Sequence, residues 1–559
     1  MYDSLADHFT HVPEKADMKT YTIDIEEKGS APLSSNSSTF DQDAGQGTWK
    51  ASTQDFLIMS TMAISSLMVA LDATILVPVL TTLAHDLHAS ATETFWIGTA
   101  YLLSHSVLQP LISTLSDIFG RRELLVPSIS FFAVGSILCA VAKNFTQMLA
   151  GRVVQGVGGA GVIALSQLVF ADIVPLRQRP KYFTMVLGAW AIGSVLGPLA
   201  GGVCVEKASW RWCFYINLPI CAVALPMAFL FVQLEHVTKT TLSEKLRKID
   251  FIGNFLFISS LTALLVAISW GGVQFEWSSW QTIVPLVIGA VGLVVSVLYE
   301  TRLAATPFLN KAVFNQPSAI ASYSAAMLQG LILYIALYYG AFYFTAAHFF
   351  GPLQTGLSIL PCSIFLVPSS AIVSALITRT SKFRWAIQSG WTISTLAAGL
   401  FILFDNHTPT VIWAIALSLL GLGMGMLLSS INFSVQAVVD SAHAAHAAAT
   451  YAFTRSIGMT LGVALGGSIF QNIARHKLTN LQVPFAAEIA KDAEAYVHVL
   501  RTLPVAQQDV IMQGYVAGFR GIWVAMTALC ACGIVTSVFV KRGTLDRVLE
   551  SRFSRIQDR

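Results

Sequence analysis

The sequence predicts an all-α polytopic membrane protein. Hydrophobic residues make up 54% of the 559 residues, charged residues only 12%, and the mean hydropathy is +0.64. Soluble domains carry about 25% charged residues, so the deficit is large. Continuous apolar runs recur along the chain, each close to the roughly 20 residues that a helix needs to cross a bilayer. A membrane β-barrel would instead alternate between polar and apolar residues.

Residues 1–52 are polar and contain no long apolar run, which predicts a disordered cytosolic tail. The first apolar run begins near Phe56 and is a full span, so it is not a signal peptide. The apolar runs predict fourteen spans, and their approximate bounds are 56–84, 95–116, 123–142, 148–172, 183–203, 212–234, 250–270, 281–300, 319–346, 353–377, 384–404, 410–436, 448–473 and 521–540.

The distribution of Lys and Arg predicts that the N-terminus lies in the cytosol. In that orientation the inner loops between spans hold 14 Lys and Arg, whereas the short outer loops hold 3. An even number of spans also places the basic C-terminal tail, 541–559, inside. The long loop 474–520 then lies outside, and its apolar stretches predict short helices on the outer face. Two glycosylation triplets, which begin at Asn144 and Asn406, fall on the outer side close to the membrane.

Several ionisable residues lie within the predicted spans, where such groups usually face a cavity or a partner. Asp72 lies in the middle of the first span. A carboxylate cannot snorkel far, so we expect it to be protonated or paired with a cation. Proton coupling requires a carboxyl whose proton affinity depends on access to one side or the other, and Asp72 is a candidate for that role. Arg152 and Arg455 lie near span ends, where snorkelling to the surface is an alternative. His105 and Gln109 share a helix face, and a simple packing role is equally open to them.

The stretch STLSDIFGRRELL, 113–125, closes the second span and opens an inner loop. Gly120 would allow a tight turn, and Arg121 and Arg122 would anchor the inner side. Anchoring does not explain Asp117, which lies at the membrane face. We therefore expect a charge lock between helix ends that opens and closes.

The stretch LGAWAIGSVLGPLAGG, 187–202, is apolar enough to span a membrane and rich in glycine. Glycines spaced four residues apart leave one helix face bare, so a second helix can approach closely. Pro198 removes one helical hydrogen bond and bends the helix. The spacing is compatible with a static contact or with an interface that moves. The glycines are Gly188, Gly193, Gly197, Gly201 and Gly202.

No catalytic, metal or nucleotide motif is present in the sequence, so we expect neither an enzyme nor a cofactor. The stretch GVGGAG, 156–161, lies inside an apolar span and follows no strand, which favours helix packing over dinucleotide binding. Cys204 and Cys213 flank one short loop and could pair, but none of the seven cysteines has metal-type spacing. Because the sequence contains no nucleotide-binding motif, any uphill transport would depend on an ion gradient.

Taken together, these motifs resemble the major facilitator superfamily, in particular its fourteen-span drug:H⁺ antiporter branch. STLSDIFGRR is similar to the family's loop motif, although Ser113 and Ile118 depart from it. LDATI at 71–75 resembles the first-span motif, and GRVVQGVGGAG at 151–161 resembles the fourth-span motif, whose arginine is implicated in proton transfer. GSVLGPLAGG at 193–202 closely matches the antiporter motif of the fifth span.

The resemblance implies two six-helix halves and two inserted central helices, fourteen transmembrane helices in all. The implied segments are the tail 1–52, the N-terminal half 53–235, the cytosolic loop and inserted pair 236–305, the C-terminal half 306–540 and the tail 541–559. By this resemblance, the fifth span should lie at the seam between the halves and face the tenth span. The long tail and the motifs look like those of fungal members, many of which export toxins, pigments or antifungals.

The expected function is proton-driven export of amphipathic organic molecules across the plasma membrane, or across the vacuolar membrane, by a monomer. The resemblance implies that Asp72 and Arg152 couple protons and that Asp117, Gly120, Arg121 and Arg122 form a cytosolic gate. The expected cavity residues are Trp190, Gln329, Tyr334, Tyr338, Asn432 and Arg455, some of which could equally pack or face lipid. An importer of the same fold, for example for siderophores, remains the main alternative, followed by a passive channel and a membrane sensor.

Overall fold

The computed structural model describes residues 51–541, apart from short gaps at 77, 88–90, 237–240, 305–306 and 309, together with residues 543 and 553–555. Of the predicted N-terminal tail, only its last two residues are described. Helix α1 begins where Ser52 and Asp55 form a reciprocal capping box, which satisfies two backbone N–H groups at the helix start.

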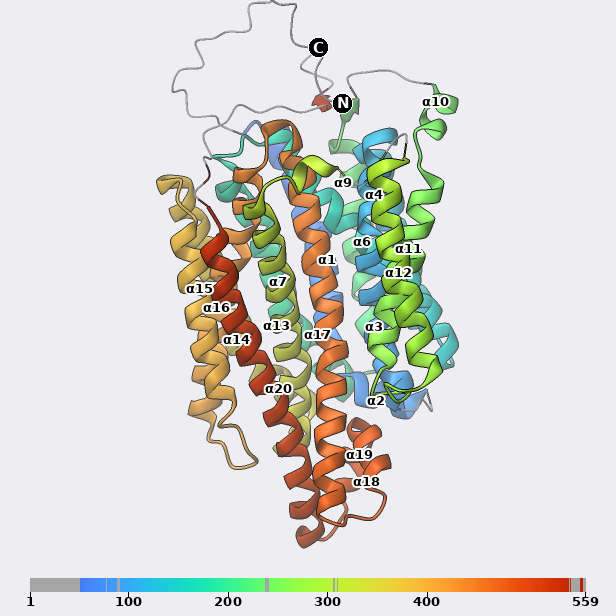
Figure 1. Cartoon of the computed structure of the whole chain (residues 1–559), viewed down its shortest axis with the longest axis vertical. Coiled ribbons are helices and arrows are strands. Elements are labelled where there is room, and N and C mark those ends of the chain that lie inside the picture. The colour runs from blue at the N-terminus through green and yellow to red at the C-terminus, as the bar shows by residue number, and fades with distance from the viewer. Residues whose placement is uncertain are drawn as a thin grey trace, which may run out of the picture. The chain divides into compact units, whose positions relative to one another are not determined.

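The helices from the first half of the chain pack together as one bundle (Figure 1). Their bounds are α1 Thr53–Ile75, α2 Leu80–Asp86, α3 Ala91–Val107, α4 Gln109–Phe119, α5 Arg121–Ala140, α6 Phe145–Ile173, α7 Arg179–Lys207, α8 Trp212–Tyr215 and α9 Asn217–Phe231. Gly120 separates α4 from α5 with φ of 125°, a conformation that favours glycine. Pro110 lies in the first turn of α4, where it disrupts no helical hydrogen bond.

The central segment contributes a pair of apolar helices that follow a short, exposed polar helix. Their bounds are α10 Leu242–Arg247, α11 Phe251–Trp270 and α12 Trp280–Arg302. Helix α11 packs on α12, and it also contacts both α3 and α17. Phe257, Leu261 and Leu265 of α11 bury their side chains there with Val107.

The second half of the chain forms another bundle, joined by the short helices η1 and η2. Its elements are η1 Lys311–Val313, α13 Pro317–Ala347, α14 Pro352–Thr380, α15 Arg384–Phe401, α16 Thr410–Val438, η2 Ser441–His443, α17 Ala444–Asn480, α18 Ala486–Lys491, α19 Ala493–Leu500 and α20 Val505–Phe539. The two bundles meet where α7 packs along α14 and where α17 packs on α3, α4 and α6.

Among the described residues, twelve helical segments are long and apolar enough to cross a membrane. The two predicted spans outside this set are 95–116 and 384–404. The first corresponds to α3 and α4, which are interrupted at Leu108, and the second corresponds to α15. A count of fourteen spans therefore stays a prediction.

The long outer loop is shorter than the expected 474–520, because α17 continues to Asn480 and α20 begins at Val505. Polar residues in the first turns of α20 hide this extension from hydropathy. The helix has a buried face there, on which Tyr515 stacks with Phe470 of α17. Short helices α18 and α19 lie beside the outer ends of α17 and α20 (Figure 1).

A small two-stranded sheet joins the end of α9 to the C-terminal tail. Strand β1, Leu234–His236, follows α9, and strand β2, Phe553–Arg555, belongs to the C-terminal tail. The strands pair in antiparallel fashion with Leu234 opposite Arg555. This pairing brings together two segments that the charge distribution assigns to the same side of the membrane.

Candidate functional site

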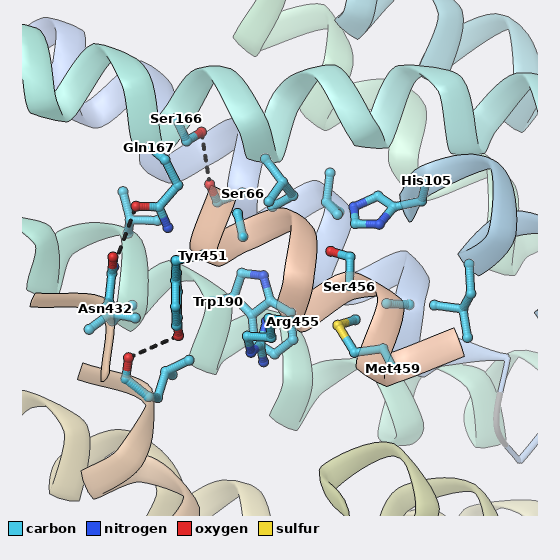
Figure 2. A pocket seen from close by; sticks show the side chains of 18 of the residues that line it. Ser66, His105, Ser166, Gln167, Trp190, Asn432, Tyr451, Arg455, Ser456 and Met459 are labelled. Atoms are coloured by element: carbon cyan, nitrogen blue, oxygen red, sulfur yellow. Dashed lines mark hydrogen bonds between the residues drawn. The ribbon is translucent and has the colours of Figure 1, made fainter. Parts of the chain in front are cut away.

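A small cavity lies between the two bundles and is lined by α1, α3, α6 and α7 from one side and by α13, α16 and α17 from the other (Figure 2). Its volume is about 60 Å³. Pockets for drug-sized ligands measure about 300–1,000 Å³, so the walls would have to separate to admit an organic molecule.

Four of the six predicted cavity residues line this space, namely Trp190, Tyr334, Asn432 and Arg455. Gln329 lies behind Arg455 and accepts a hydrogen bond of 2.8 Å from its Nε. Tyr338 stacks on Tyr334, with a centroid distance of 6.1 Å, and packs against an apolar cluster that includes Val79 and Leu83.

Several lining residues were not predicted, and they are Ser66, Tyr101, Ser166, Tyr451 and Ser456. Serine and tyrosine are common in membrane helices, so nothing in their spacing distinguishes these positions. His105, which the sequence singled out, also lines the cavity, and so does Gln167 of α6.

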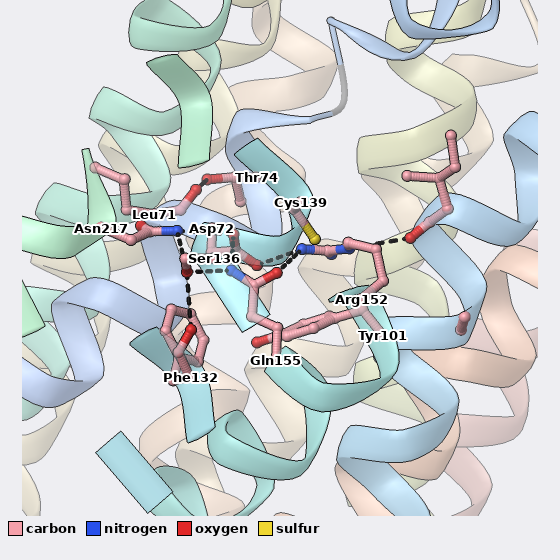
Figure 3. A network of polar contacts seen from close by, with 12 residues as sticks. Leu71, Asp72, Thr74, Tyr101, Phe132, Ser136, Cys139, Arg152, Gln155 and Asn217 are labelled. Carbon is pink, nitrogen blue, oxygen red and sulfur yellow. Dashed lines mark hydrogen bonds and ion pairs between the residues drawn. The ribbon is translucent and has the colours of Figure 1, made fainter. Parts of the chain in front are cut away.

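Next to the cavity, Asp72 is the centre of a buried polar network (Figure 3). Its Oδ2 accepts a hydrogen bond of 2.8 Å from Arg152 Nη1. Its Oδ1 accepts from Gln155 Nε2 at 2.7 Å and from Asn217 Nδ2 at 3.0 Å. Ser136 joins the network by accepting from Gln155 at 2.9 Å. Neither Asn217 nor Ser136 was predicted as a site residue, although Asn217 lies in the stretch SWRWCFYINLP, 209–219, which also resembles the family.

Arg152 is buried, with only 2% of its side chain exposed, so the structure excludes the alternative that it snorkels to the surface. Its Nε donates to the Ile97 carbonyl oxygen at 3.1 Å. Its guanidinium group lies 4.3 Å from the centre of the Tyr101 ring. Because Tyr101 also lines the cavity, one ring contacts both the ion pair and the space where a ligand would bind.

At the end of the bundles that the charge distribution predicts to be cytosolic, Arg121 holds two carboxylates together. It forms ion pairs with Asp117 at 2.7 Å and with Asp172 at 2.9 Å, and it is 2% exposed. Asp172 was not predicted, because it lies at the end of an apolar span with no motif around it. Arg122 is exposed and pairs only with its neighbour Glu123, at 3.3 Å.

Two contacts connect the bundles near this charge cluster. His446 Nδ1 of α17 lies 3.7 Å from Asp117 Oδ2 of α4. Arg179, which the sequence suggested only as a loop cation, is buried at the start of α7 and donates to Gln436 of α16 at 2.8 Å. These contacts close the inner side of the cavity.

A different contact closes the opposite end, which the charge distribution predicts to be the outer side. Glu206 of α7 accepts a hydrogen bond from the Leu353 N–H of α14 at 3.3 Å. Nearby, within the second bundle, Arg501 donates to the Phe349 and Phe350 carbonyl oxygens at 3.1 and 3.2 Å. The neighbouring helix α19 contains a carboxyl group, that of Glu494, whose pKa burial raises to about 7.

The glycine-rich stretch of α7 has two faces with different partners. A side chain at Gly193, Gly197 or Gly201 would collide with α1, which belongs to the same bundle. At Gly202 a Cβ atom would instead lie 2.6 Å from Leu353 Cα, and Pro198 lies against Gly356. The stretch therefore contacts α14 as expected, but most of its glycine face packs on α1.

Asn144 caps α6 and accepts from the Gln147 N–H at 2.9 Å, whereas Asn406 lies in the loop between α15 and α16. All seven cysteines are free, so the structure contains no Cys204–Cys213 disulfide. Within the described part of the chain, no group of three or more His, Cys, Asp or Glu side chains has an arrangement suited to a metal ion.

Two helical bundles that enclose a cavity beside a buried ion pair define a membrane transporter. The family model described as Major Facilitator Superfamily matches residues 62–463. The chain belongs to this superfamily, whose members are transporters and not enzymes.

Relatives in fungi are similar over most of the chain. "MFS transporter L2" of a Phoma species is 38% identical over 87% of this chain and 82% of its own length. "Efflux pump FUS6" of Gibberella moniliformis is 32% identical over 90% of this chain and 91% of its own length. The fold resembles the crystal structure of a bacterial homologue of the human lysosomal transporter Spinster, with 15% identity and a TM-score of 0.57. The match covers 88% of this chain and 98% of the other.

Proposed function

We propose that this protein is a proton-coupled antiporter that exports amphipathic organic compounds, such as secondary metabolites, toxins or drugs, by alternating access. The names of its fungal relatives, which include efflux pumps, support the direction of transport. The proposal places the protein in the fourteen-span drug:H⁺ branch, as a monomer in the plasma membrane. Helices α3 and α4 together, and α15, would supply the two further spans.

The observation that carries the proposal is the ion pair between Asp72 and Arg152. Asp72 is fully buried, and the structure surrounds it with donors from α6 and α9. A proton that binds Asp72 removes its negative charge and so weakens the bond to the guanidinium group. Arg152 would then shift against Tyr101, which changes the cavity wall. Antiport requires that the binding of a proton changes which conformation of the transporter is favoured, and this link between Asp72 and the cavity wall would provide it.

Alternating access follows from the two sets of closing contacts. In the cytosol-open state, the contacts of Arg179 with Gln436 and of His446 with Asp117 would be broken, and substrate would enter. In the outward-open state, the contact of Glu206 with Leu353 would be broken instead. Arg121, with Asp117 and Asp172, would stabilise the inner ends of α4, α5 and α6 as one unit.

Transport by the full chain in inside-out membrane vesicles tests the proposal. The vesicles are offered pyrene-1-butyrate, its amide and pyrene-1-butylamine, and the lumen is made acidic. We expect uptake of at least one probe, driven by the pH gradient. Asp72→Asn should abolish gradient-driven accumulation, whereas Asp440→Asn, an exposed carboxylate in a loop, should not.

Two results would contradict the proposal. Gradient-driven accumulation by Asp72→Asn at the parent rate would show that protons couple elsewhere. Probe movement only in the direction of import would favour the importer of the same fold.

A further inference from the structure

Arg455 presents an unpaired cationic group at the central cavity. Its side chain extends from α17, and its Nε donates to Gln329 Oε1 at 2.8 Å. The guanidinium carbon lies 5.2 Å from the centre of the Trp190 ring, and Figure 2 shows the two side chains against each other. Its Nη2 is buried and has no hydrogen-bond partner.

No carboxylate neutralises this arginine among the described residues. Arg152 pairs with Asp72 and Arg121 pairs with Asp117 and Asp172, but Arg455 forms no ion pair. Among the described side chains that line the cavity, none is an Asp or a Glu, and Arg455 is the one with a permanent charge. The side chains that line the cavity in this structure therefore carry a net positive charge.

Other polar groups around the cavity are also unsatisfied. The hydroxyls of Tyr101 and Tyr334 and the Nε2 of His105 are buried without a partner, and all three side chains line the cavity. Buried polar groups are normally hydrogen-bonded, and a buried charge is normally paired. A cluster of unsatisfied groups around one buried cation indicates that a ligand supplies the missing partners.

We infer that the substrate of this transporter is an amphipathic organic acid, bound as its anion to Arg455. This inference rests on the proposed function and specifies its substrate class. A guanidinium group matches the geometry of a carboxylate and can donate two parallel hydrogen bonds to it. The Tyr334 hydroxyl, on α13 of the same bundle, also lines the cavity without a partner and could donate a further bond. The acid group would thus be held between α13 and α17.

The apolar part of the substrate would lie against the other bundle. Trp190, Phe183 and Val186 of α7 line the cavity on that side, opposite Met459 of α17. An organic amine of the same shape would be repelled by Arg455, and a neutral amide would leave it without a counter-charge.

Binding to the purified full chain tests the inference without any requirement for transport. Pyrene-1-butyrate, its amide and pyrene-1-butylamine share one apolar body and differ in charge, and decanoate with its amide and amine forms a second set. Affinities are measured by equilibrium dialysis at pH 7.4. We expect the acid to bind roughly 10- to 100-fold more tightly than the amide, the range for a hydrogen bond to a charged group.

The variants show whether a preference for the acid comes from the cavity arginine or from the net charge of the whole protein. Arg455→Gln should reduce the affinity for the acid to that for the amide, and Arg455→Lys should restore part of the preference. Arg475→Gln makes the same change on an exposed part of α17 and should leave the preference intact. An acid preference that persists in Arg455→Gln, or the lack of one in the parent with both sets, would overturn the inference. Export of amides or amines by the parent would leave the proposed function standing while rejecting this substrate class.

Discussion

Gly202 offers the sharpest test of how the two bundles move, because it lies where α7 touches α14. A Cβ atom there would be 2.6 Å from Leu353 Cα and 2.8 Å from its backbone nitrogen. Carbon atoms pack best at about 3.5–4.0 Å, so even a methyl group requires the outer ends of these helices to separate by about 1 Å. The Gly202→Leu variant requires more.

The expected effect is a shift towards the outward-open state. Overpacking costs about 1–3 kcal/mol, and a cost of this size on the closed state changes the conformational equilibrium by about 5- to 150-fold. The assay is labelling of a Tyr338→Cys reporter by an impermeant maleimide from outside, alongside export of the pyrene probes. Labelling should become faster and export slower.

Two glycines on the same helix serve as controls. Gly188 has no atom within 4 Å of its Cβ position, so Gly188→Leu should leave labelling and export unchanged. Gly197→Leu would collide with Thr74 of α1 and should impair folding within one bundle without opening the outer side. If Gly202→Leu labels no faster than the parent, closure does not depend on this contact and the reasoning is wrong.

Two further outcomes are expected. Arg121→Gln removes the buried cation that bridges the carboxylates of Asp117 and Asp172, which should destabilise the protein by about 3–5 kcal/mol in thermal unfolding. Loss of the exposed Arg122 pair should cost less than about 1 kcal/mol, and equal losses would show that the cluster is not a structural unit. Burial raises the pKa of Glu494 from 4.5 to about 7, so the packed α19 segment is favoured while this carboxyl is protonated. Its stability should therefore fall as the pH rises from about 4.5 to 7, measured by hydrogen exchange of residues 486–500, and Glu494→Gln should remove the dependence.

Composition and motifs predicted the helical class, the family and the individual residues Asp72, Arg152 and Arg121. They did so because ionisable groups in apolar spans are rare and costly. They could not identify the partners. Asn217 is an ordinary amide in the sequence, and only the packing of α9 against α1 brings it to the carboxylate.

The glycine stretch illustrates the same limit in a different way. The spacing of Gly193, Gly197 and Gly201 correctly indicates one smooth helix face, since residues four apart lie above one another. The sequence does not say which helix covers that face. Gly202 is one residue further along and so points about 100° away, which is enough to change its partner from α1 to α14.

Helix α11 has a consequence for the route of a membrane-soluble substrate. It lies across α3 and α17, where one edge of the two bundles meets. Phe257, Leu261 and Leu265 cover that edge. A hydrophobic acid dissolved in the inner leaflet would find this side sealed against lateral entry. It would have to partition into the cytosol or pass between α7 and α14. The central helices α11 and α12 would thus select for molecules that leave the lipid before they bind.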